Sequence, residues 1–355
     1  MSAKYLLGID IGSSSIKIVQ LRIMGGEVML ETYGEISNAP YADKDLGGIA
    51  RPGKDKLSEE LSDLVHEIDA RSRRSGVAIP FNETLMSQVD LPKRDKEQMD
   101  KIIPAEAQRF IPVPVNEIML DWYAIPEPET YAFDAMKPKQ MTEAQFQKIM
   151  IIGVNKKTAQ SFTSAMAESG FSCEFFEIEI FSALRASMHA KKEPTLLLDL
   201  GASSTKAAIA SEHWVLLAGR LIPVGGAFIT EEIRHAQNID FPAAERLKCE
   251  QGLAPGSTVA PIIEKSIAPV WSYIEQVMDE LKKKNQRSVE HVLLCGGGAY
   301  MPGVREYIQK KMSLPVEVMH GFSRTKGPMV LEDIIELDGP RYAIAAGLAL
   351  RGIGR

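Results

Sequence analysis

The chain of 355 residues has few of the residue types that build metal or disulfide sites. Its three cysteines, Cys173, Cys249 and Cys295, lie far apart in the sequence. Neither they nor the six histidines have the spacing of a zinc motif or a redox motif. We therefore expect reduced, buried thiols and no structural zinc.

Long hydrophobic runs and an excess of positive charge are also missing. The apolar stretch before Asp10 is too short for a secretory signal, and no other stretch reaches the roughly 20 apolar residues of a membrane span. The formal net charge of -6 argues against a protein held on nucleic acid by a broad basic face. We expect a soluble, cytoplasmic protein without direct membrane insertion, which contacts a membrane only through a partner or a surface helix.

Apolar periodicity predicts an α/β protein. Strands are expected at residues 5–10, 16–23, 27–36, 84–91, 118–125, 147–154, 171–177, 195–200, 204–210, 215–223, 291–295 and 316–319. Helices are expected at 56–73, 95–110, 156–169, 180–189, 227–237, 242–251, 259–284, 304–312 and 341–351. The polar segment 126–145 is interpreted as an exposed loop, and the run 84–176 as a compact inserted module.

An internal repeat is the most informative pattern. LLGIDIGSSSIKIV, residues 6–19, resembles TLLLDLGASSTKAA, residues 195–208. Five polar or small residues of the first copy recur at the same offsets in the second: Asp10, Gly12, Ser14, Ser15 and Lys17 become Asp199, Gly201, Ser203, Ser204 and Lys206. The repeat predicts two homologous half-domains, each with a strand, a turn and a second strand.

The composition of the repeated turn is typical of phosphate binding. Glycine lets the backbone approach a ligand, and the turn's N–H groups and hydroxyls can face an anion. The predicted phosphate-binding residues are Gly12, Ser13, Ser14, Ser15 and Lys17 in the first copy and Gly201, Ser203, Ser204 and Thr205 in the second. Asp10 and Asp199 are predicted to hold a hydrated Mg²⁺. The alternative is that both turns are ordinary hairpin turns of a large sheet.

Three weaker motifs fit the same site. Gly296, Gly297 and Gly298 follow a short apolar strand and offer a flat surface for an adenine or a ribose; the alternative is a strand-to-helix loop. Glu245 and Lys248 share a helical face and can bind ribose hydroxyls, although a solvated surface pair is the other interpretation. Gly225 and Gly226 precede a helix whose N-terminus can point at the nucleotide.

The order of these motifs resembles the actin, Hsp70 and sugar-kinase superfamily, and within it the PilM family of type IV pilus assembly. The resemblance rests on LLGIDIGSSSIKIVQL (6–21), LPKRDKEQMDKIIPAEAQRFIPVPVNEIMLDWYAI (91–125) and the segments 220–226, 241–248 and 294–304. The chain departs from the family pattern at 126–145, and at Cys295, where we expect serine or another small residue.

The resemblance implies an actin-like ATPase fold, in which two homologous ribonuclease H-like halves surround a nucleotide cleft. Subdomain 1A is then expected at 1–83, 177–212 and 335–355, the inserted α/β subdomain 1C at 84–176, and subdomains 2A and 2B at 213–334. The implied cofactors are ATP and Mg. The implied partner is the cytoplasmic N-terminal tail of PilN, an inner-membrane protein, in a groove between 1A and 1C, and other pilus assembly proteins are further implied partners.

Two alternatives share the nucleotide cleft: an FtsA-like cell-division protein and a small-molecule kinase. The FtsA type carries a membrane-binding tail, which is not seen after Arg351, and a kinase needs an aspartate base for which we find no candidate. Hydrolysis needs a group that orients water near the γ-phosphate. Glu179 is the candidate for this catalytic role, although an acid at a helix entry explains the same residue, and the sequence leaves turnover open.

Overall fold

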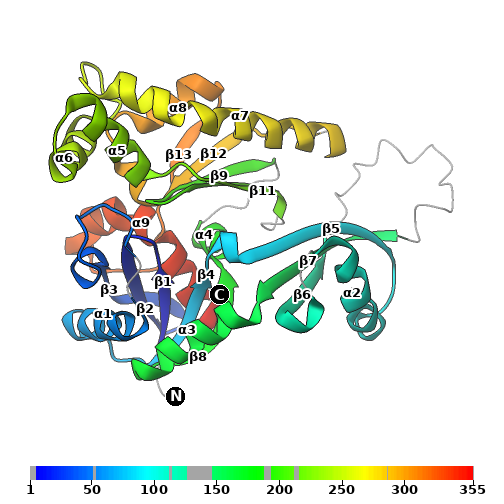
Figure 1. Ribbon diagram of the computed structural model, residues 1–355. Coiled ribbons are helices and arrows are strands. Elements are labelled where there is room, and N and C mark those ends of the chain that lie inside the picture. Colours follow the sequence, from blue (N-terminus) through cyan, green and yellow to red (C-terminus); the bar gives the residue numbers. More distant parts are fainter. Residues whose placement is uncertain are drawn as a thin grey trace. The chain divides into compact units, whose positions relative to one another are not determined.

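The structure, a computed structural model, describes residues 5–50, 53–111, 114–125, 146–187, 193–211, 216–285 and 287–354. The predicted loop at 126–145 lies outside these residues. The chain forms two compact units (Figure 1). The larger unit comprises Met1–Phe81 with Ser164–Arg355, and the smaller unit comprises Asn82–Thr163.

Two sheets of equal topology form the frame of the larger unit. The first has the order β3-β2-β1-β4-β8 and the second the order β11-β10-β9-β12-β13. In each, three antiparallel strands are followed by two parallel ones. The first sheet contains β1 (Tyr5–Ile11), β2 (Ser15–Met24), β3 (Glu27–Ser37), β4 (Arg74–Ile79) and β8 (Ser172–Ile178). The second contains β9 (Thr195–Leu200), β10 (Thr205–Ala210), β11 (Leu216–Ile222), β12 (His291–Cys295) and β13 (Val316–Val318). The sequence repeat is therefore a repeat of structure.

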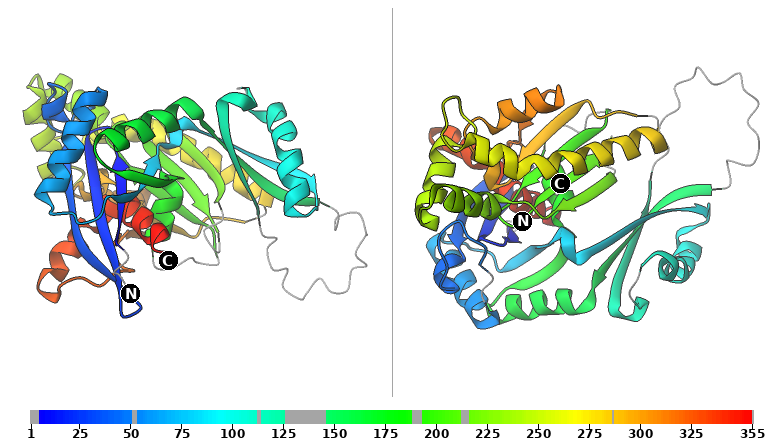
Figure 2. Two further views of the ribbon diagram at one scale, coloured as in Figure 1. Left: turned by 90° about the horizontal axis from the view of Figure 1, so that it is seen from below. Right: turned by 45° about the horizontal axis from the view of Figure 1, so that its top comes forward.

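Helices cover both sheets (Figures 1 and 2). α4 (Glu179–Ala186) and α9 (Glu332–Gly352) pack on each other, and α9 lies against β1, β2 and β4 and also reaches β12. α1 (Lys54–Glu67) lies on β2 and β3, while α7 and α8 contact the second sheet and α5 packs on α6 and α7. These four are α5 (Gly226–Gln237), α6 (Phe241–Gln251), α7 (Ala260–Asn285) and α8 (Val304–Met312). None of the helices in the described ranges has the length and apolar character needed to cross a bilayer.

Short 3-10 helices complete the described secondary structure. They are η1 (Ala39–Tyr41), η2 (Phe81–Glu83), η3 (Val115–Glu117), η7 (Gly297–Tyr300) and η8 (Met329–Leu331). Of the three glycines predicted to follow β12, Gly296 precedes η7, and Gly297 and Gly298 are its first two residues.

Glycine allows α9 to approach its neighbours closely. A Cβ on Gly8 of β1 would lie 1.9 Å from the carbonyl oxygen of Ala345 in α9. A Cβ on Gly347 of α9 would lie 1.8 Å from the carbonyl oxygen of Ser182 in α4. Glycines in β1 and α9 therefore let β1, α9 and α4 pack with their backbones almost in contact.

The predicted helix at 56–73 is wrong at its C-terminal end. α1 ends at Glu67, Asp69 adopts a left-handed conformation with φ 49°, and residues 74–79 form β4. The side-chain oxygen of Gln20 accepts hydrogen bonds from the backbone N–H groups of Arg71 and Ser72, at 2.8 Å each. This contact with β2 directs the chain into the sheet, and it joins residues too distant for a local pattern to reveal.

The helix predicted at 341–351 begins earlier, at Glu332. Pro340 lies inside it, although proline usually ends or kinks a helix because it removes an N–H donor. The carbonyl oxygen of Pro340 accepts a hydrogen bond from Gly296 N–H at 2.9 Å. The proline is therefore held where α9 meets the glycine segment after β12.

The smaller unit has one antiparallel sheet of order β5-β7-β6. Its strands are β5 (Thr84–Pro92), β6 (Ile118–Ala124) and β7 (Phe146–Asn155), with α2 (Lys96–Phe110) and the start of α3 (Lys156–Glu168) beside them in the chain. Asp95 caps α2 by accepting from Gln98 N–H at 2.8 Å. Met99 and Ile103 of α2 share a buried core with Ile149 and Ile151 of β7. This unit is shorter than the predicted module 84–176, because β8 pairs with β4 in the larger unit.

A buried carboxyl group lies on α1. Glu60 is fully buried, and neither of its carboxyl oxygens has a hydrogen-bond partner among the described residues. Burial raises the pKa of Glu60 to about 7, because the charged form loses its hydration. The folded protein therefore favours the protonated form of this group.

We expect the Gly8→Ala variant to be destabilised by about 1–3 kcal/mol or more, because its methyl group would collide with α9. Urea or thermal unfolding measures the change. Gly53→Ala is the matched control, since a Cβ there has no neighbour within 4 Å. Equal stability of the two variants would contradict the close packing of β1 and α9.

We expect stability to fall as the pH rises from about 4.5 to about 7, because the folded chain keeps the Glu60 proton over this interval and the unfolded chain releases it. Glu60→Gln should remove this slope and raise stability above pH 7 by about 1–3 kcal/mol. Thermal unfolding across this pH range measures the effect. Glu59→Gln, an exposed neighbour, should leave the slope in place.

Candidate functional site

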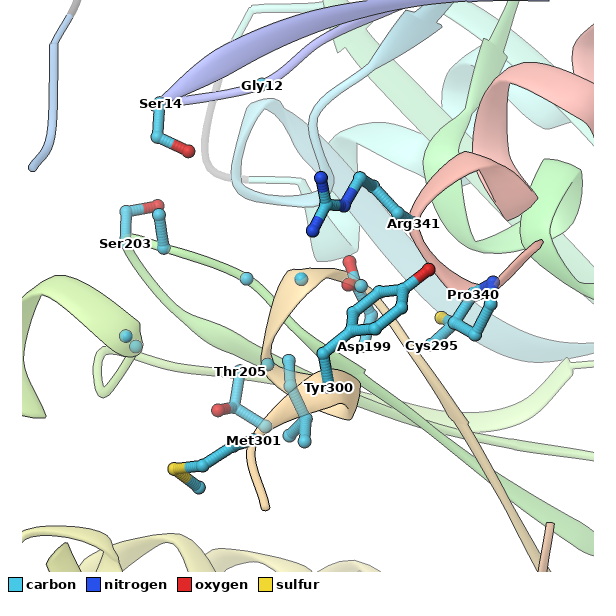
Figure 3. A pocket seen from close by; sticks show the side chains of 18 of the residues that line it. Gly12, Ser14, Asp199, Ser203, Thr205, Cys295, Tyr300, Met301, Pro340 and Arg341 are labelled. Carbon is cyan, nitrogen blue, oxygen red and sulfur yellow. The ribbon is translucent and has the colours of Figure 1, made fainter. Parts of the chain in front are cut away.

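A cavity of about 890 Å³ lies in the larger unit, and both repeated turns line it. Figure 3 shows Ser14 and Ser203 at the tips of the two turns, with Arg341 and Tyr300 nearby. The structure brings together all predicted site residues except Ser204: Asp10, Gly12, Ser13, Ser14, Ser15, Lys17, Glu179, Asp199, Gly201, Ser203, Thr205, Gly225, Gly226, Glu245, Lys248, Gly296, Gly297 and Gly298.

The first turn is closed by a short backbone hydrogen bond. Gly12 N–H donates to Ser15 O at 3.0 Å, and a Cβ on Gly12 would lie 2.9 Å from that oxygen. Asn38 holds the turn from outside, since its side-chain N–H₂ donates to Gly12 O and to Ala50 O, each at 3.0 Å. The turn is therefore fixed with its hydroxyl groups toward the cavity.

The second turn repeats this geometry. Gly201 N–H donates to Ser204 O at 3.1 Å, and a Cβ on Gly201 would lie 3.0 Å from that oxygen. The start of α5 is bound to this turn, with Gly226 N–H donating to Gly201 O at 2.9 Å. A Cβ on Gly225 would lie 2.4 Å from Ala202 O, so the glycine pair allows the N-terminus of α5 to reach the cavity.

Ser204 is the predicted ligand residue that does not line the cavity. It is buried beneath the second turn, and its carbonyl oxygen accepts the closing hydrogen bond. The corresponding residue of the first turn, Ser15, does line the cavity and accepts a hydrogen bond from Lys17 Nζ at 2.7 Å. Equivalent positions of a repeat thus have different access to the cavity.

Asp10 lies at the floor of the cavity without a hydrogen-bonded side-chain partner among the described residues. Burial raises its pKa, and the positive charges of Lys17 and Lys206 oppose this effect. A buried carboxylate of this kind is stabilised by a cation. Its position suits the predicted contact with a hydrated metal ion.

The sequence analysis did not predict a group of interacting side chains beside the first turn. Lys17 Nζ lies 3.2 Å from Glu35 Oε1, Arg341 donates to Glu35 Oε2 at 2.9 Å, and the Arg341 guanidinium lies 4.9 Å from the centre of the Tyr300 ring. Burial would raise the pKa of Glu35, but Lys17, Ser15 and Arg341 lower it below its ordinary value. One contact of this group of charged side chains has a local signal in the sequence, because Lys17 lies opposite Glu35 where the neighbouring strands β2 and β3 pair.

A second charged group lies beside the second turn. Lys206 Nζ donates to Asp199 Oδ2 at 2.8 Å and to Glu179 Oε2 at 2.9 Å. The other oxygen of Glu179 accepts from Phe81 N–H at 2.7 Å. Glu179 is also the first residue of α4. It therefore lines the cavity and is at the same time the acidic residue at the start of a helix.

The three glycines after β12 lie at the end of the second sheet. Cys295 is paired in register with Asp199, and Gly296 adopts a left-handed conformation with φ 82°. A Cβ on Gly296 would lie 2.4 Å from Asp199 Oδ1. Glycine is needed here because the backbone passes directly over an acidic side chain of the site.

Glu245 and Lys248 of α6 are not a solvated surface pair. Lys248 is buried, and its Nζ lies 2.6 Å from Glu245 Oε2, 2.8 Å from Thr230 Oγ1 and 3.1 Å from Gly226 O. These contacts join α6 to the start of α5 at the wall of the cavity. Both side chains are therefore positioned rather than free in solvent.

The cysteines differ from one another in exposure. All three thiols are free, and Cys295 is buried, whereas Cys173 is half-buried and Cys249 is exposed. The prediction of buried thiols is therefore wrong for Cys249, which follows Lys248 on the helix that borders the cavity. Burial raises the pKa of the Cys295 thiol, so this group is a packed, uncharged side chain.

The comparison with known families decides the family. A family model described as "Type IV pilus assembly protein PilM" matches residues 8–353. The chain belongs to this PilM family. The resemblance found in the sequence motifs is thus confirmed.

Solved structures support the same fold. A chain of a "PilM-PilN type IV pilus biogenesis complex" is 22% identical, covers 99% of both chains and has a TM-score of 0.81. MreB 5 of Spiroplasma citri, solved with AMPPNP bound, is 11% identical, covers 97% of this chain and 94% of its own, and has a TM-score of 0.53. The predicted actin-like fold is confirmed for this PilM family member.

Curated relatives match more weakly. The cell division protein FtsA of Helicobacter pylori (strain ATCC 700392 / 26695) is 24% identical over 237 residues, which is 58% of this chain and 47% of FtsA. The chain thus spans about half the length of the curated relatives it matches. This partial match gives the FtsA alternative less support than the PilM family has.

Proposed function

We propose that this chain is a nucleotide-binding scaffold of type IV pilus assembly that holds the cytoplasmic N-terminal tail of PilN. The observation that carries the proposal is the PilM family match over residues 8–353, in a chain whose two repeated turns line one cavity. The solved PilM–PilN complex supports the choice of partner. The scaffold would lie at the inner membrane through that partner.

ATP is the nucleotide that we propose for the cavity. The two turns offer backbone N–H groups and the hydroxyls of Ser14 and Ser203 to its phosphates, and Lys17 adds a positive charge. The glycines 296–298 would face the adenosine, with Glu245 and Lys248 near the ribose. The MreB 5 structure, which contains AMPPNP, supports a nucleotide in this type of fold.

Magnesium would accompany the phosphates. Mg²⁺ keeps several of its waters and uses one or two carboxylates, and Asp10 is a buried carboxylate without a hydrogen-bonded partner in the part of the chain that is described. Asp199 would support the hydrated ion from the second half. When bound, the ion would neutralise part of the triphosphate charge.

Turnover is proposed to be slow or absent. Glu179, the candidate for orienting water, is engaged on both carboxyl oxygens, by Lys206 and by Phe81 N–H. Burial raises the pKa of Glu179, and Lys206 opposes this effect. A group held by two partners positions a helix and a lysine, but it is poorly placed to activate a water molecule.

The PilN tail is proposed to contact a wall made of β5 and α2 in the smaller unit. A hollow of about 420 Å³ lies there, lined by Gln88, Val89, Asp90, Leu91, Pro92, Glu106, Arg109 and Phe110. Phe110 as a whole residue is 49% exposed. Exposed apolar surface next to polar groups is typical of a peptide-binding site. The smaller unit would then correspond to subdomain 1C, and the larger to 1A, 2A and 2B.

We expect Mg-ATP to raise the unfolding temperature of the protein, because a ligand that binds only the folded state stabilises it. At about 1,000 times its dissociation constant the gain is roughly 4 kcal/mol. Asp10→Ala should lose most of this shift, whereas Asp333→Ala, an exposed acid of α9 outside the cavity, should keep it. Absence of any shift in the unchanged protein would disprove the nucleotide site.

We expect a synthetic PilN N-terminal peptide to bind the purified protein, and Phe110→Asp to weaken binding about tenfold or more, because the substitution removes apolar contact area. Fluorescence anisotropy measures the affinity. Phe146→Asp is the matched control, since Phe146 is 50% exposed in the same unit but does not line the hollow. Equal loss in both variants would argue against this wall, and phosphorylation of a small metabolite without peptide binding would favour the kinase.

A further inference from the structure

The two lysines of the repeat occupy equivalent positions but have different partners. Lys17 lies opposite Asp10 in the β1–β2 hairpin, and Lys206 lies opposite Asp199 in the β9–β10 hairpin. Lys17 binds Ser15 and Glu35, and therefore leaves the Asp10 carboxylate without a hydrogen bond to its own hairpin. Lys206 binds Asp199 itself, together with Glu179. The repeat is thus symmetric in its backbone and asymmetric in its charges.

The Lys206 ion pairs are largely shielded from water. The exposed fraction of the Lys206 side chain is 15%, and those of Glu179 and Asp199 are 8% and 7%. Two carboxylates contact its ammonium group, with Nζ 2.8 Å from Asp199 Oδ2 and 2.9 Å from Glu179 Oε2. Lys206 therefore places a positive charge in the wall of the cavity, held by two acids.

This charge affects any phosphate that enters the cavity. More acidic than basic side chains line the cavity: the acids are Asp10, Glu35, Glu179, Asp199, Glu245 and Asp338, and the bases are Lys17, Lys206, Lys248 and Arg341. Without Lys206, the carboxylates of Asp199 and Glu179 would face the phosphates unneutralised. In a partly buried site such repulsion is much stronger than in water. A divalent cation from solution would then be required between these carboxylates and the phosphates.

We propose that Lys206 is a built-in counter-ion on the side of the cavity that the second half forms. It supplies positive charge that a divalent metal ion would otherwise bring. The nucleotide therefore binds with a reduced dependence on Mg²⁺. This inference rests on the proposed nucleotide function. It assigns the metal-dependent part of nucleotide binding mainly to Asp10, whose carboxylate has no direct lysine contact in the described part of the chain. Lys206 acts by neutralising the carboxylates of Asp199 and Glu179, which its ammonium group contacts.

The test measures AMPPNP affinity by isothermal titration calorimetry, once in excess MgCl₂ and once in EDTA, for the unchanged protein and for Lys206→Met. The substitution keeps an unbranched side chain, shorter by the terminal ammonium group, and removes the charge. We expect the affinity of the variant to fall at least about tenfold in EDTA, equivalent to about 1.4 kcal/mol. In MgCl₂ the loss should stay below about threefold, because the ion replaces the missing charge. The ratio of the AMPPNP affinity in MgCl₂ to that in EDTA should therefore be larger for Lys206→Met than for the unchanged protein.

Two further variants separate charge from structure. Lys206→Arg keeps the positive charge and should restore a ratio close to that of the unchanged protein. Lys326→Met removes an exposed lysine that does not line the cavity, and should leave both affinities unchanged. The double variant Lys206→Met with Glu179→Gln leaves only one carboxylate unpaired, and it therefore guards against misfolding. Its ratio of AMPPNP affinity in MgCl₂ to that in EDTA should still exceed the ratio of the unchanged protein.

The outcomes separate the two proposals. If Lys206→Met and the double variant lose affinity equally in MgCl₂ and in EDTA, Lys206 has only a structural role and the counter-ion proposal is overturned, while nucleotide binding stands. If the unchanged protein binds AMPPNP under neither condition, the nucleotide function and the counter-ion proposal are both overturned. A ratio that increases in Lys206→Met and returns in Lys206→Arg supports the proposal.

Discussion

The close approach of α9 to β1 and to α4 holds the cavity together. Backbone meets backbone at Gly8 and at Gly347, where a single added Cβ would overlap a carbonyl oxygen. Because α9 is so near, its residues Asp338, Pro340 and Arg341 reach the cavity. The same helix receives a hydrogen bond from Gly296 of the second half at Pro340. One tightly packed helix thus connects both sheets to the site.

The two halves share a backbone design and differ in electrostatics. Each turn is closed by a glycine N–H bonded to the residue three positions later, and each glycine is needed for steric reasons. Around this common frame, Asp10 of the first half has no direct ionic partner within the described ranges, and Lys206 neutralises Asp199 in the second half. A duplicated frame can therefore hold two different environments for the same phosphate chain.

The cavity and the smaller unit contribute different parts of the proposed function. Phosphate turns of this kind belong to the actin-like fold in general, and they do not distinguish a scaffold from a kinase or a filament protein. In the proposed scheme, the family match over residues 8–353 makes that distinction. In the proposed scheme the nucleotide stabilises the larger unit, and the surface of β5 and α2 serves the partner.

Local sequence patterns by themselves determined all the described strands but β4, the two turns and the polar and glycine residues with which these turns line the cavity. They did so because a hairpin with Asp, Gly and serines depends on neighbours within about ten residues. Tertiary structure alone decided that the chain after α1 enters the first sheet as β4, that β8 joins it, and that Ser15 lines the cavity while Ser204 does not. It also brought Glu35, Arg341 and Tyr300 together and gave Lys206 its partners. Many of these contacts join residues far apart in the chain, and their energies depend on burial and charge that no local pattern contains.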